Sequence, residues 1–117
     1  KAYQEPYKEN IIFKNNFRKS FHPSHLRSFY VWLFKKIPKK YFLKNRGSFF
    51  KTCEDKAIMF PLIELSGKRH KFIKQKLYFY NDINPIGLYK NKSIERLKKT
   101  NSNIIKSMKP LKPLDYL

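Results

Sequence analysis

The protein is 117 residues long, which limits it to one small domain or part of one and excludes a two-domain enzyme. Hydrophobic residues make up 41% of the chain and aromatic residues 17%, so a packed core can form. The single cysteine, Cys53, excludes an internal disulfide and indicates a reducing compartment. No apolar run reaches the ~20 residues that cross a bilayer as a helix.

The charge of the chain is strongly positive. Lysine and arginine outnumber aspartate and glutamate by 27 to 8, which gives a formal net charge of +19. This charge predicts binding to a nucleic acid or another polyanion. The alternative is compositional drift, because lysines occur in every segment, whereas phosphate recognition usually uses clustered and often arginine-rich surfaces. Both interpretations stay open.

The first half of the chain carries mixed signals. Residues 1–24 are polar and broken by prolines, so loops are expected on either side of a short strand or helical turn at the apolar island 11–13. Residues 26–37 fit either a buried strand or the apolar face of a helix. Trp32 lies in this aromatic stretch, where a place in the core is the simplest role and sugar stacking the alternative. Residues 39–50 predict a basic connector with a turn at 45–48.

The strongest helix signal follows Thr52. Glu54 and Asp55 lie in its first turn, where carboxylates interact favourably with the helix dipole, and apolar residues continue to a stop at Gly67. Such a helix is apolar nearly all round and should be buried. Pro61 removes one backbone hydrogen bond, so a bend or a later start is expected.

The residue pattern of the remaining chain predicts a strand followed by a helix. Residues 71–80 are rich in aromatic residues and Ile, which favours a strand closed by the turn signals at 81–85. Residues 93–108 place apolar side chains at helical spacing with lysine and arginine on the other faces. An amphipathic C-terminal helix is therefore predicted, and Pro110 ends it. Together these elements indicate an α/β fold.

One pair of side chains stands out as a candidate catalytic site. Glu54 and Asp55 are the only adjacent acidic residues in this basic chain. A carboxylate at the head of a buried helix can be oriented by backbone amides and can accept a proton as a general base. The structural alternative is helix capping. His22, His25 and His70 share no spacing typical of a metal site.

The order of several blocks resembles the C-terminal half of family 2 glycosyltransferases with the GT-A fold. The resemblance covers about residues 10–90 and rests on these blocks: HLRSF (25–29), WLF (32–34), NRGSFFK (45–51), EDKAIMFPLIELSG (54–67), FI (72–73), LYFYN (77–81) and NP (84–85). It implies one partial α/β domain over 1–117, a partial Rossmann-like GT-A fold. Residues 10–90 would form the acceptor side, and 91–117 a C-terminal helix and tail.

The resemblance also implies roles for individual residues. Asp55 precedes the Lys56-Ala57 step of the motif and would be the catalytic base, with Glu54 as its neighbour. In this family a divalent metal, Mg or Mn, is held on the diphosphate by an Asp-x-Asp motif in the nucleotide-binding half. That half is missing here, and His70 is the nearest metal-ligand candidate. We expect a fragment that is inactive alone.

The partners follow from these interpretations. The complete enzyme would use a nucleotide-sugar donor and a glycan or lipid-linked acceptor, in the cytoplasm and in peripheral contact with a membrane through the C-terminal helix. The alternative is a small basic protein that binds RNA or another polyanion and stacks bases on Tyr78 and Tyr80.

Overall fold

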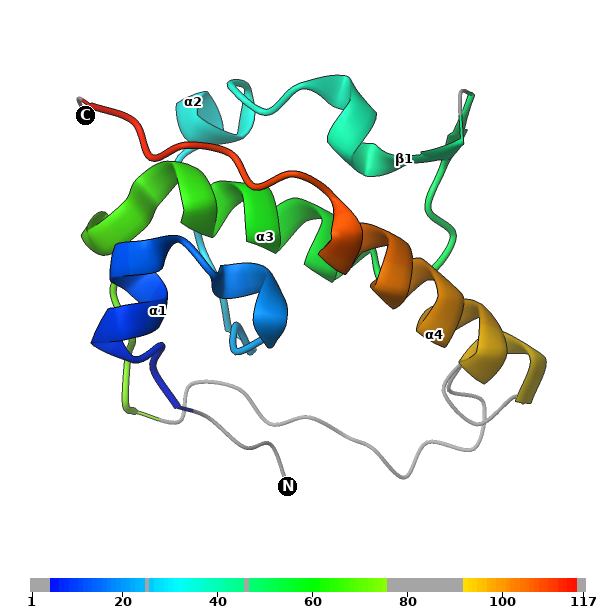
Figure 1. Ribbon diagram of the computed structural model, residues 1–117, viewed down its shortest axis with the longest axis horizontal. Coiled ribbons are helices and arrows are strands. Elements are labelled where there is room, and N and C mark those ends of the chain that lie inside the picture. Colours follow the sequence, from blue (N-terminus) through cyan, green and yellow to red (C-terminus); the bar gives the residue numbers. More distant parts are fainter. Residues whose placement is uncertain (1–4, 25, 46, 76–91, 116–117) are drawn as a thin grey trace.

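The computed structural model describes residues 5–24, 26–45, 47–75 and 92–115. These parts form a mixed α/β structure that is mostly helical, with a small two-stranded sheet (Figure 1). The α-helices are α1 (Glu9–Lys14), α2 (Val31–Phe34), α3 (Glu54–Ser66) and α4 (Lys92–Ser107). The 3-10 turns are η1 (Phe17–Lys19), η2 (Lys39–Phe42) and η3 (Gly67–Arg69), and the strands are β1 (Leu43–Asn45) and β2 (Ser48–Phe49). The two strands pair antiparallel, with Leu43 opposite Phe49.

Helix α3 lies at the centre of the fold. It contacts α2, α4 and the 3-10 turns η1, η2 and η3, and Figure 1 shows it between α1 and the α2 segment. It begins at Glu54 as the acidic pair predicts, ends before Gly67, and continues through the buried Pro61. The predicted buried helix is thereby confirmed.

Two apolar clusters pack against different sides of α3. The helical spacing of Ala57, Phe60 and Ile63 gives one face, and that of Leu62 and Leu65 gives another. The first cluster is completed by Tyr7, Phe17, Phe50 and Ile105, and the second by Ile37 and Tyr41. Helix α3 is buried nearly all round because it supplies both clusters.

A buried ion pair joins the elements around α3. Arg18 donates from Nε to Glu64 Oε2 (2.7 Å) and from Nη2 to Oε1 (2.8 Å). Arg18 Nη1 also donates to the Ile105 carbonyl (2.8 Å), and the Leu111 amide donates to Glu64 Oε1 (3.1 Å). Both side chains of the pair are buried. The pair therefore connects η1, α3, α4 and the residues that follow α4.

The C-terminal segment, residues 108–115, crosses α3 in extended form (Figure 1, orange to red). Hydrogen bonds to distant parts of the chain hold its backbone: Tyr41 Oη to Lys109 O (2.9 Å), Asn15 Nδ2 to Leu111 O (2.7 Å), and Leu114 N to Leu65 O (2.9 Å). Gly67 has φ 59°, and a Cβ there would lie 3.1 Å from Pro113 Cβ. Only glycine suits both the left-handed backbone and this close approach.

The structure decides the open predictions for the first half of the chain and corrects the one for Trp32. Residues 31–34 form one short helix, and Trp32, predicted in the core, is 39% exposed. The basic connector at 39–50 contains η2 and the β1–β2 hairpin around the predicted turn. The apolar island at 11–13 belongs to α1, where Ile11 and Ile12 pack inward and Phe13 is exposed.

In the second half, the amphipathic helix is confirmed as α4. Ile105 is buried, and Ile104 and Met108 pack against the core. Residues 71–75 form no strand, and the rest of the predicted strand and its turn lie outside the described residues. Across the described ranges, no helix is both long enough and apolar enough to span a membrane.

The stability of the fold at high pH should depend on the hydroxyl of Tyr7. Its hydroxyl donates to the Ser20 carbonyl (2.8 Å) and accepts from the His22 amide (3.1 Å). Burial, reinforced by the Glu64 charge, raises the pKa of Tyr7 from 10.0 to about 12, against the opposing effect of the His22 amide. Above pH 10 the unfolded state loses this proton first, so folding stability falls as pH rises toward 12.

The expected loss is roughly 1.4 kcal/mol per pH unit across that window. Urea unfolding from about pH 9 to about pH 12 measures it, and Tyr7→Phe is the reference that cancels the titration of the lysines. A Tyr7→Phe protein with the same alkaline slope as the native protein would contradict the assignment.

Candidate functional site

The site begins with the carboxylate of Asp55 in the first turn of α3. Its Oδ1 accepts a hydrogen bond from the Lys56 amide (2.8 Å). Its Oδ2 lies 3.4 Å from Arg27 Nη2, which forms an ion pair. The Asp55 side chain stays 44% exposed, while that of Arg27 is 17% exposed. The carboxylate is thus oriented from two sides and remains accessible to a small molecule.

The cation that pairs with this carboxylate, Arg27, shares an aromatic ring with a second cation. The guanidinium of Arg27 lies 5.7 Å from the centre of the Phe21 ring, and Lys56 Nζ lies 5.8 Å from it. Lys56 Nζ also donates to Ser102 Oγ (3.1 Å) on α4. Cation–π contacts of this kind hold the two long side chains against the ring. The partner of Asp55 is therefore a cation that is itself held by an apolar ring.

The start of α3 is fixed by the residues just before it. Cys53 has φ 64°, a left-handed conformation that costs a non-glycine residue about 1–2 kcal/mol. Asn101 of α4 is fully buried, and its Nδ2 donates to both the carbonyl and the hydroxyl of Thr52 (3.3 Å each). These bonds hold the sharp turn that points the chain into α3. Asp55 is therefore placed by α4 as well as by its own helix.

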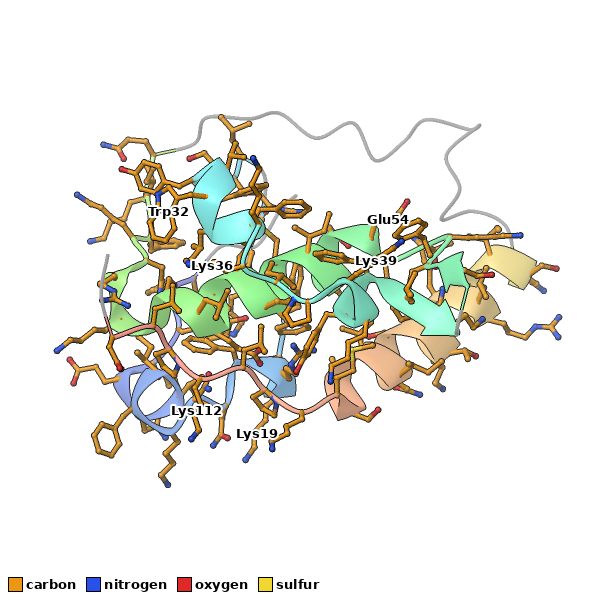
Figure 2. All side chains as sticks on the ribbon, turned by 90° about the horizontal axis from the view of Figure 1, so that it is seen from above. Lys19, Trp32, Lys36, Lys39, Glu54 and Lys112 are labelled. Carbon is orange, nitrogen blue, oxygen red and sulfur yellow. The ribbon has the colours of Figure 1, made fainter. Side chains whose placement is uncertain are left out.

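Glu54, the other predicted acid, is exposed at the same helix end. Figure 2 labels it at the end of α3 near the hairpin. Asp55, by contrast, has its carboxylate oriented by the Lys56 amide and by Arg27. Of the two adjacent acids, Asp55 is therefore the better placed to act as a base.

His70 lies at the opposite end of α3 from Asp55. The helix between Asp55 and Ser66 spans roughly 16 Å at 1.5 Å per residue, and His70 follows it after η3. Its ring packs edge-on against Tyr7 and Phe17. Its Nδ1 lies 2.7 Å from the Gly67 carbonyl. Because a carbonyl only accepts, Nδ1 carries the proton, and Nε2 keeps its lone pair in the neutral ring.

The described part of the chain does not assemble a metal site. It holds no group of three or more His, Cys, Asp or Glu side chains that could bind an ion. His70 has the tautomer that a ligand binding through Nε2 needs. His25 lies outside the described residues. The LYFYN block, which contains Tyr78 and Tyr80, lies outside them as well.

Comparison with known proteins finds no matching family model, no matching curated protein and no matching solved structure. The geometry of the site therefore indicates what it can do. That geometry offers an oriented, accessible carboxylate beside a cation. Sequence reasoning assigns no role to Arg27, which lies in the HLRSF block, because no pattern indicates its contact with Asp55 across 28 positions.

Proposed function

We propose that this chain is the acceptor side of a family 2 glycosyltransferase with the GT-A fold, and that Asp55 is its general base. The observation that carries the proposal is the Asp55 carboxylate, which is oriented by the Lys56 amide and Arg27 yet 44% exposed. The sequence resemblance over about residues 10–90 supports the same assignment.

The proposed reaction is a single displacement at the anomeric carbon. The acceptor hydroxyl oxygen forms a bond to that carbon while the bond from the carbon to the diphosphate oxygen breaks. The nucleoside diphosphate leaves with the electron pair, and the hydroxyl proton passes to the Asp55 carboxylate. The product is a glycoside with inverted configuration. Arg27 and the Lys56 amide would keep the carboxylate aimed at the hydroxyl.

A divalent metal, Mg or Mn, would belong to the nucleotide-binding half of the complete enzyme, where it would neutralise charge on the leaving diphosphate. The described residues supply no ligand set for it. His70 would be the contribution from this half, through Nε2. Because it lies at the other end of α3 from Asp55, we assign it no part in proton transfer.

The test is an assay of the complete enzyme with a panel of nucleotide-sugars. We expect release of nucleoside diphosphate that depends on an added glycan or lipid-linked acceptor. The anomeric configuration of the product, read by NMR, should be inverted. A product that retains the donor's configuration would contradict direct attack, and the absence of transfer with any donor would contradict the proposal itself.

The RNA-binding alternative stays a prediction. Figure 2 shows Lys19 and Lys112 projecting from a different part of the molecule than Lys36 and Lys39, a spread that favours compositional drift. Filter binding of RNA at increasing salt tests it. A steep linear fall on a log–log plot would support phosphate recognition.

A further inference from the structure

The segment before and within α2 exposes a run of large apolar side chains. Tyr30 is 71% exposed and Val31 65%, and the Tyr30 and Trp32 rings stack on one another at 6.1 Å. We call the following residues the aromatic face: Phe29, Tyr30, Val31 and Trp32. Isolated exposed apolar residues are ordinary on protein surfaces, but Tyr30, Val31 and Trp32 are consecutive and two of their rings stack, which is typical of an interaction surface.

The aromatic face is held in place by neighbouring side chains of α2 that pack against the core. Leu33 and Phe34 of α2 pack against the second core cluster, and Ile37 is buried within it. The Phe29 ring stacks on that of Phe34 at 6.0 Å. Because the short helix turns Leu33 and Phe34 inward, Tyr30 and Val31 at its start are left exposed. The exposure is thus a consequence of how α2 is fixed.

Four exposed lysines directly follow the aromatic face: Lys35, Lys36, Lys39 and Lys40. In the sequence, every charged residue between Glu9 and Glu54 is Lys or Arg. Figure 1 places α2 and η2 along one edge of the molecule, and Figure 2 looks onto that edge with Trp32, Lys36 and Lys39 labelled. Apolar side chains and positive charge therefore share this edge.

We propose that this edge docks on the surface of an anionic lipid bilayer. Tyr and Trp side chains favour the headgroup region, where the ring is partly apolar and its polar atom is hydrated. Lysines beside them are attracted to acidic headgroups. Val31 favours a membrane over RNA, because an aliphatic side chain gains by entering acyl chains and cannot stack on bases. The proposal is independent of the glycosyltransferase assignment.

Trp32 makes the proposal directly measurable, because it is the only tryptophan of the chain. Vesicles of phosphatidylcholine with phosphatidylserine should shift its fluorescence to the blue, and vesicles of phosphatidylcholine alone should not. Lipids brominated on their acyl chains should quench it if the ring reaches them. High salt should reverse the binding, since the charges involved are exposed.

Two variants separate the contributions of the aromatic face and the lysines. Tyr30→Ser with Val31→Ser should weaken vesicle partitioning about tenfold or more, because each side chain loses its apolar burial. Lys35→Gln, Lys39→Gln and Lys40→Gln together should remove the dependence on phosphatidylserine. All of these side chains are exposed, so circular dichroism should show unchanged helix content.

The matched control makes the same charge change on α4. Lys92→Gln, Lys99→Gln and Lys106→Gln also replace three exposed lysines and should reduce partitioning by a few-fold at most. An equal loss in this control would overturn the proposal and assign binding to net charge or to the C-terminal helix.

Three further results would overturn the proposal. One is an unshifted Trp32 spectrum with acidic vesicles. Another is a spectral change with poly(U) RNA that prevents vesicle binding, which would assign the edge to nucleic acid. The third is a dimer by light scattering that the Tyr30→Ser, Val31→Ser variant converts to monomer, since a second copy would then cover the face.

Discussion

If the proposed function holds, replacing Asp55 by Asn should lower the turnover of the complete enzyme about 100- to 10,000-fold, the range that a lost general base costs. Asparagine keeps the size of the side chain and can still accept the Lys56 amide hydrogen bond, but its amide cannot take the hydroxyl proton. Because donor binding does not use this group, the KM for the nucleotide-sugar should change little. Steady-state kinetics at saturating acceptor measures both constants.

Two other carboxylates make this experiment specific. Glu9 is an exposed acid in the first turn of α1, so Glu9→Gln repeats the charge change at a helix start away from the site and should leave turnover unchanged. Glu54→Gln tests the adjacent acid, and we expect a few-fold effect. If Glu54→Gln caused the large loss and Asp55→Asn did not, the base would be Glu54.

Replacing Glu64 by Gln should destabilise the fold by about 3–5 kcal/mol, because it leaves the buried Arg18 charge without a counter-ion. Domains of this size are commonly stable by only about 5–15 kcal/mol, so much of the margin would be lost. Glutamine keeps the shape of the side chain, but it replaces one of the two acceptor oxygens by a donor. Urea unfolding followed by circular dichroism gives the free energy difference.

The Arg27–Asp55 pair is the matched control for this variant. It also joins an arginine to a carboxylate, but its carboxylate is 44% exposed, so Arg27→Gln should cost less than about 1 kcal/mol. The double variant Arg18→Met, Glu64→Leu removes both charges and should recover only part of the loss. It leaves the Leu111 amide and the Ile105 carbonyl without these partners, at about 1–3 kcal/mol each. Equal stability losses in the buried and exposed pairs would refute the argument.

Sequence reasoning succeeded where local pattern and burial agree. Helix α3 was predictable because an acidic first turn, an unbroken apolar run and Gly67 give consistent start and stop signals. Helix α4 was predictable from its amphipathic spacing. The same local signal gave the position of Asp55 at the head of a buried helix, which is the core of the candidate site.

The parts that could not be predicted depend on contacts distant in sequence. Arg18 and Glu64 each look like surface residues, and only the fold shows that they neutralise one another in the core. Trp32 belongs to a run with no decisive period, so its exposure depends on which neighbours α2 turns inward. The orientation of Asp55 by Arg27 likewise depends on packing that no short pattern encodes.

The buried Arg18 side chain bonds residues that are distant in sequence, and this affects how quickly the protein folds. Arg18 bonds partners 46 and 87 positions away, and Asn15 bonds one 96 positions away. Helical proteins usually fold fast because their contacts are local, whereas distant contacts must first overcome the entropy of closing long loops. Helices α3 and α4 can form within microseconds, but the core closes only when both ends of the described chain meet over α3. Folding is therefore expected to be slower than the helical content suggests.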